Sequence, residues 1–100
     1  MDLRRFMQTA RDLIARLAPR LDQQQAEFIR QDAHAGEWDL AIDNLLATLK
    51  KHQVTITPAD KADLHSLLAY LAWPDTKLDG LTITDPARTP PPDTPATGRG

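Results

Sequence analysis

The chain has 100 residues, a formal net charge of -2 and no cysteine. This length fits one small domain, and the lack of cysteine excludes disulfides, thiolate metal sites and thiol catalysis. The mildly acidic balance argues against a nucleic-acid partner, which needs a strong positive field. We expect a soluble, cytoplasmic protein, because small secreted domains usually need disulfides and no stretch is apolar enough to be a signal peptide or to span a membrane.

The first predicted helix covers about residues 2–17. Its apolar residues recur at the spacing of one helix face: Leu3, Phe6, Met7, Ala10, Leu13, Ile14 and Leu17. Asp12 and Arg16 are four residues apart, so we expect them to form a weak ion pair. Pro19 ends this helix, since proline disfavours helical geometry at the residue before it.

The second predicted helix covers about residues 23–35. Asp22 is a suitable N-cap, and Gln25 follows three residues later, as in a capping box. Phe28 is predicted to widen the apolar face, whose other members are Ala26, Ile29 and Ala33. Gly36 is the residue type that commonly ends a helix.

The third predicted helix, at about residues 37–51, is the most apolar one. Its stripe consists of Trp38, Ala41, Ile42, Leu45, Leu46 and Leu49. We therefore expect it to form the centre of the core. The acidic residues in its first turns and the basic pair at its end both have the sign that suits the helix dipole.

The fourth predicted helix covers about residues 58–72. Thr57 is a good N-cap, Pro58 suits the first helical position, and Asp60 stands where a capping carboxylate belongs. Its apolar residues are Leu64, Leu67, Leu68 and Leu71. The sequence Trp73-Pro74 is expected to end it.

Each of these helices is too short to be stable alone, so we expect them to pack into a compact all-α, four-helix domain over residues 1–74. Residues 75–84 are predicted to be partly extended, and residues 81–84 could pair with residues 54–56 as a marginal ribbon. Residues 85–100 include five prolines among sixteen residues. This composition predicts a disordered tail.

No catalytic, cofactor or metal site is expected. His65 and Ser66 are adjacent on a helix, so their side chains diverge by about 100° and do not suit nucleophilic catalysis. Asp39 and Asp43 could chelate a hard cation at their i, i+4 spacing, but a solvated helix face is the alternative. We therefore expect a protein that is not an enzyme and that acts by contact with another macromolecule.

Acidic side chains cluster in the middle of the chain. Residues 21–49 contain six carboxylates and one arginine, whereas residues 1–20 contain five arginines and two aspartates. The acidic block is either an ordinary solvated surface or a docking patch that steers a basic partner. The candidate partner-binding residues are Glu37, Asp39 and Asp43, followed by Glu27 and Asp32.

A family resemblance covers about residues 10–72. The stretch AEFIRQDAHAGEWDLAIDNLLATL, followed by ITPADKADLHSLLAYL, resembles the MafI-type immunity proteins of bacterial polymorphic toxin systems. The motifs that carry it are Gly36-Glu37-Trp38, Leu40-Ala41, Ile56-Thr57-Pro58 and LAPRL at residues 17–21. The resemblance implies a small cytoplasmic protein that binds and neutralises a cognate toxin, often a nuclease. It specifies no toxin-contacting residue, and the proline-rich tail is outside the family pattern.

Other functions remain open at this point. A small helical adaptor or regulatory subunit, unrelated to toxins, fits the same composition. Gly36, Trp38 and Ala41 are also similar to the second helix of a tetratricopeptide unit, but such folds need about three repeats and one copy is visible. A DNA-binding domain is disfavoured, because the acidic third helix would repel phosphate.

Overall fold

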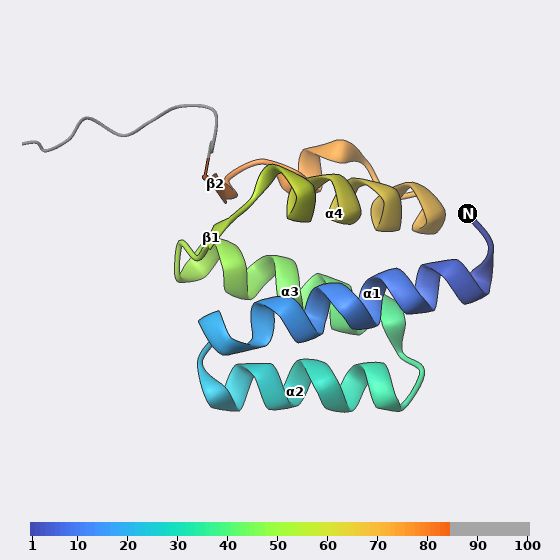
Figure 1. Ribbon diagram of the computed structural model, residues 1–100, viewed down its shortest axis with the longest axis horizontal. Coiled ribbons are helices and arrows are strands. Elements are labelled where there is room, and N and C mark those ends of the chain that lie inside the picture. The colour runs from blue at the N-terminus through green and yellow to red at the C-terminus, as the bar shows by residue number, and fades with distance from the viewer. Residues whose placement is uncertain (85–100) are drawn as a thin grey trace, which may run out of the picture.

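The computed structural model describes residues 1–84; the predicted disordered tail, residues 85–100, lies outside the described residues. Over this part of the chain the protein is an all-α domain, as predicted, built from α1 (Leu3–Leu17), α2 (Gln23–His34), α3 (Trp38–Lys51) and α4 (Pro58–Leu71). Successive helices run in opposite directions (Figure 1). In this view α1 crosses in front of α3, with α2 on one side of the pair and α4 on the other.

Local capping signals set where the helices begin. The carboxylate of Asp2 accepts a hydrogen bond from the backbone N–H of Arg5 at 2.8 Å and so caps α1. Asp22 caps α2 in the same way, as its sequence position predicted. Thr57 and Asp60 form a reciprocal capping box at the start of α4, each side chain accepting from the other residue's backbone N–H at 3.1 Å.

The turn between α2 and α3 depends on Gly36. Its φ is +80°, a left-handed conformation that side-chain-bearing residues rarely adopt. The N–H of Gly36 donates to the carbonyl of Ala33 and that of Glu37 to the carbonyl of Asp32, at 3.0 and 2.9 Å. This Schellman pair of bonds closes α2 and lets α3 begin two residues later, antiparallel to α2 (Figure 1).

Short elements complete the described chain. A 3₁₀ turn, η1 (Ala18–Arg20), follows α1, and another, η2 (Asp75–Leu78), follows α4. The strands β1 (Thr55–Ile56) and β2 (Thr82–Ile83) pair in parallel, with Thr55 opposite Thr82. The predicted pairing of the two extended segments is therefore confirmed. The sequence prediction had missed η2, whose Leu78 is buried in the core.

The core is formed by the inward faces of all four helices. Its completely enclosed side chains include Phe6, Leu13, Leu17, Ile29, Ile42, Leu45, Leu49, Ile56, Leu64, Leu67 and Leu68. As predicted, α3 contributes a large share, with six buried residues. None of the helices among residues 1–84 is long and apolar enough to cross a membrane.

Two residues that were predicted to be in the core are exposed. Leu3 is 54 % exposed and is the first residue of α1. Phe28 is 49 % exposed. The buried face of α2 is narrow and consists of Ala26 and Ile29. Phe28 is about 100° from Ile29 around the helix and therefore lies outside this face.

The predicted ion pair within α1 is also wrong. Arg16 crosses to α4, where one Nη2 atom donates to Asp60 and to Asp63, each at 2.8 Å. Asp12 instead accepts from the side-chain amide of Gln8 at 2.9 Å. Two carboxylates on the facing helix outcompete one exposed carboxylate on the same helix, because charge-assisted bonds to a partly buried acceptor are stronger.

Candidate partner-binding surface

The exposed side of α3 carries three of the predicted partner-binding residues. Ala41, Ile42 and Leu45 point into the core, and α3 residues on the opposite side face solvent. We call the exposed set Glu37, Asp39, Leu40 and Asp43 the outer α3 face. It presents one large apolar side chain, Leu40, at 46 % exposure, next to three carboxylates.

The carboxylates of the outer α3 face are engaged to different degrees. Asp39 accepts a 2.9 Å hydrogen bond from the backbone N–H of Leu40 and is exposed. Asp43 lies 3.4 Å from the ammonium group of Lys77 in η2, so its charge is partly offset. Lys77 is also 4.6 Å from the ring centre of Trp73, which helps to hold it there. Asp39 is therefore more available to a partner than Asp43.

Asp32 borders the outer α3 face, whereas Glu27 does not. The carboxylate of Asp32 accepts from the side-chain amide of Asn44 at 2.8 Å, which ties α2 to α3. Phe28 is one helical turn from Asp32 and adds a second exposed apolar group on this side. Glu27 is five residues from Asp32, about 140° away around the helix. It lies 3.8 Å from Arg30 instead.

No arrangement of metal ligands is present among residues 1–84: no three His, Asp or Glu side chains lie together there. The i, i+4 pair of Asp39 and Asp43 thus has no third protein ligand in this part of the chain. His65 is 3.2 Å from Asp75 and is not paired with the neighbouring Ser66.

A groove between α1 and α2 was not predicted from the sequence. Its volume is about 420 Å³, and its basic side chains are Arg11, Arg30 and His34. Its apolar lining consists of Ile14, Ala15, Ala33 and Trp38. Each helix carries its own part of the signal. In α1, Arg11 is followed three and four residues later by Ile14 and Ala15, and in α2, Arg30 is followed at the same spacing by Ala33 and His34. Which side chains of α1 and α2 face one another could not be derived from the spacing within each helix.

Trp38 connects the groove to the core. Its ring packs edge-to-face on Phe6, with centroids 6.2 Å apart, and Phe6 stacks on Tyr70 of α4 at 4.4 Å. The guanidinium of Arg11 lies over the ring, 5.5 Å from its centre. Trp38 is therefore half-buried, with one side supporting the fold and another lining the α1–α2 groove.

The sequence matches a family model over residues 1–79, the part of the chain that forms α1 to η2. The chain belongs to a family of unknown function, DUF6189. Neither the curated proteins nor the solved structures contain a match to this DUF6189 chain. The description of the DUF6189 family names no activity, so the resemblance to MafI-type immunity proteins stays a prediction.

Proposed function

We propose that this DUF6189 protein is an immunity protein, which binds a cognate toxin through the outer α3 face and neutralises it by contact. The observation that carries this proposal is the exposed Leu40 among the carboxylates of Glu37, Asp39 and Asp43. The fold itself does not use this set in its core, so these side chains are free to serve recognition.

The chemistry of the outer α3 face suits a basic protein partner. An apolar side chain that becomes buried in an interface contributes binding energy, while charged groups at its rim contribute association rate and specificity. Here Leu40 supplies the apolar centre, and Asp39 and Asp43 supply the charged rim. Phe28, exposed on the neighbouring helix, would extend the apolar contact.

The residues of the Gly-Glu-Trp motif divide between fold and surface. Gly36 ends α2 and Trp38 packs on Phe6, so both have structural roles that any protein with this hairpin would need. Glu37 is exposed, and its side chain makes no capping bond to α3. Within the motif, Glu37 is therefore the residue that we assign to the partner. The proposal places the protein in the cytoplasm and requires no cofactor, membrane or nucleic acid.

Co-expression with the toxin encoded beside the gene tests the proposal. We expect the protein to restore growth of cells that express the toxin, and the two purified proteins to elute together from a sizing column. Failure of both results would refute the proposal. A stable complex with that neighbour, without restored growth, would favour the alternative, a helical adaptor or regulatory subunit.

A further inference from the structure

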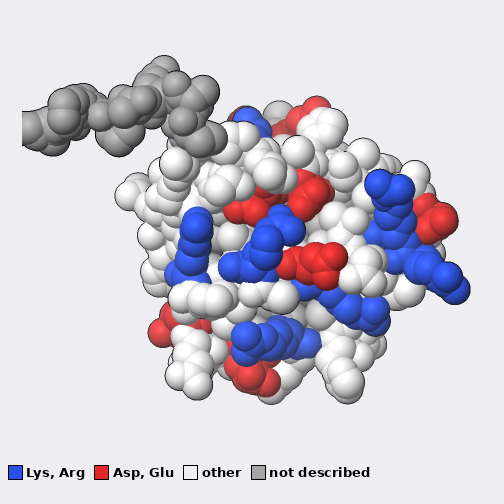
Figure 2. All heavy atoms as spheres, viewed as in Figure 1, with Lys and Arg blue, Asp and Glu red and all other residues white. Residues whose placement is uncertain are grey.

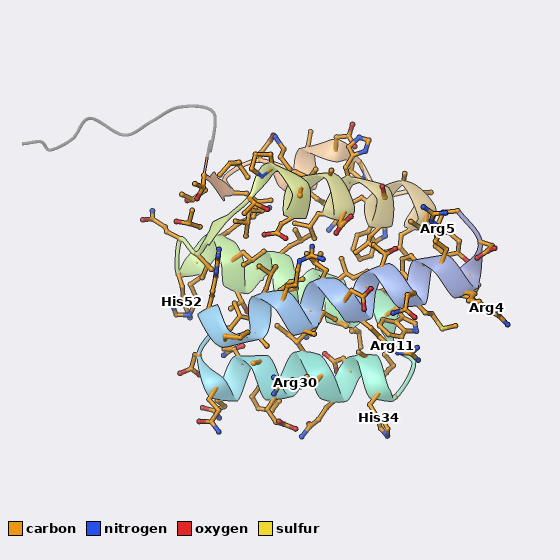
Figure 3. All side chains as sticks on the ribbon, in the orientation of Figure 1. Arg4, Arg5, Arg11, Arg30, His34 and His52 are labelled. Carbon is orange, nitrogen blue, oxygen red and sulfur yellow. The ribbon has the colours of Figure 1, made fainter. Side chains whose placement is uncertain are left out.

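The α1–α2 groove combines positive charge with an apolar lining. Arg11 comes from α1, and Arg30 and His34 come from α2, one helical turn apart. Figure 3 shows Arg11 between the two helices, and Arg30 and His34 on α2. Four of the seven lining residues are apolar, and one of them is Trp38. In Figure 2 arginine side chains lie over α1 and α2 in this view, with acidic side chains among them; neither helix contains a lysine.

The positive charge of the groove is only partly compensated within the protein. Arg30 has Glu27 at 3.8 Å, and both side chains are more than half exposed, so this pair contributes little. Arg11 interacts with the face of the Trp38 ring, which is a neutral partner. A carboxylate that enters between Arg11 and Arg30 would gain charge-assisted hydrogen bonds from both guanidinium groups.

The groove is separate from the outer α3 face. Arg30 and Asp32 are two residues apart on α2 and therefore about 200° apart around it. Asp32 points towards Asn44 of α3, whereas Arg30 points towards the side on which α1 lies. A ligand in the groove would thus be recognised by basic groups, while the outer α3 face presents acidic ones.

We propose that the α1–α2 groove binds an acidic peptide segment of a partner protein. One carboxylate of the segment lies between Arg11 and Arg30, and a neighbouring apolar side chain packs on Trp38 and Ile14. Charge complementarity selects an acidic ligand. The apolar lining of the groove, which runs between two helices, favours a peptide over a free inorganic anion. An inorganic anion has no apolar group that could contact Trp38.

A peptide display library selected on the full protein tests this assignment. We expect the selected peptides to be enriched in Asp or Glu next to an aromatic or aliphatic residue. Their affinity can be followed by Trp38 fluorescence in a Trp73→Phe background, since Trp38 lines the groove. Selected peptides without acidic enrichment would overturn the proposal.

Matched charge variants locate the binding. The double variant Arg11→Gln, Arg30→Gln is expected to weaken the selected peptides at least about tenfold. The control Arg4→Gln, Arg5→Gln removes the same charge at the N-terminal end of α1, away from the groove (Figure 3), and is expected to change affinity less than about twofold. Equal loss in both variants, or no loss in either, would contradict the assignment.

Three further measurements test the role of Arg30 and distinguish a peptide from other occupants of the groove. Glu27→Gln frees Arg30 and is expected to tighten peptide binding about twofold to threefold, a gain that a merely unfolded variant would not show. Citrate or phosphate that competed as well as the peptide would show a small-anion site and overturn the peptide assignment. A sizing column tests for self-association. Concentration-dependent dimers that dissociate when the selected peptides are added would show that a second copy occupies the groove, and would also overturn the peptide assignment.

Discussion

The α1–α4 contact and the outer α3 face use charge in opposite ways. Between α1 and α4, Arg16 bonds to Asp60 and Asp63, and Asp60 is only 5 % exposed. On the outer α3 face, Asp39 is exposed and bonds to its own helix backbone. Charged side chains that pair with one another stabilise the fold, whereas charged side chains exposed to solvent remain available for a partner. Substitution of the paired residues should therefore change the free energy of unfolding more than substitution of the exposed ones.

Among the charged side chains, removal of Asp60 should have the largest effect on stability. Asp60→Ala deletes one half of the capping box of α4 and leaves Arg16 with Asp63 alone, so we expect the free energy of unfolding to fall by about 2–3 kcal/mol. Urea denaturation measures this. Asp63→Ala, which removes a carboxylate that is 37 % exposed, is the control and should cost about 0.5–1 kcal/mol. Similar losses for the two variants would show that the contact does not depend on burial.

The same carboxylate should make stability depend on acid pH. Burial alone raises the pKa of Asp60, but hydrogen bonds from the backbone of Thr57 and from the side chains of Arg16 and Thr57 outweigh it, so the pKa lies below its usual value. The charge of Asp60 therefore stabilises the fold fully above the unfolded-state pKa of about 3.9, and this contribution is lost as pH falls through the lower folded-state pKa. Unfolding curves of Asp60→Asn should show a smaller pH dependence below about pH 4 than those of the wild type. Parallel pH profiles would contradict this account.

A stabilising change is expected at the end of α4. Ala72 is exposed and has a φ of +59°, a left-handed conformation that disfavours residues with a Cβ atom. Ala72→Gly should relieve this strain and raise the free energy of unfolding by up to about 1 kcal/mol, seen as a higher Tm. A lower Tm would show that flexibility gained by the unfolded chain outweighs the relief.

The outer α3 face should contribute least to stability. Asp39→Lys and Leu40→Ala change exposed side chains that do not pack in the core, so we expect each to shift the free energy of unfolding by less than about 0.5 kcal/mol. Leu45→Ala, on the buried side of the same helix, is the matched comparison and should cost about 2–5 kcal/mol. A large loss for Leu40→Ala would show that this face serves the fold.

Much of the fold could be predicted because its signals are local. The caps at Asp22 and Thr57, the turn at Gly36 and the apolar periodicity of each helix all depend on neighbours within a few residues. The errors arise where a side chain's environment depends on another helix. Arg16 was assigned to Asp12 because its partners on α4 are 44 and 47 residues away.

The candidate surfaces show the same limit. Exposure of Asp39 and Asp43 follows from their positions between core residues of α3, so the sequence could indicate an acidic face. It could not show that Lys77, which is 34 residues away, offsets Asp43. The α1–α2 groove forms where α1 and α2, which η1 connects, pack against each other. The apolar periodicity of each helix does not define which side chains of the two helices meet.

Binding of the toxin encoded beside the gene tests the central claim most directly, with Asp39→Lys compared against Asp12→Lys. Both variants change the net charge equally, but Asp12 is on α1 and Asp39 is on the outer α3 face. Asp43 is left unchanged because it also holds Lys77. In calorimetric titrations we predict that Asp39→Lys weakens binding at least about tenfold while Asp12→Lys leaves the Kd within about twofold. Equal affinities for the wild type and Asp39→Lys would contradict the assignment of this face to the partner.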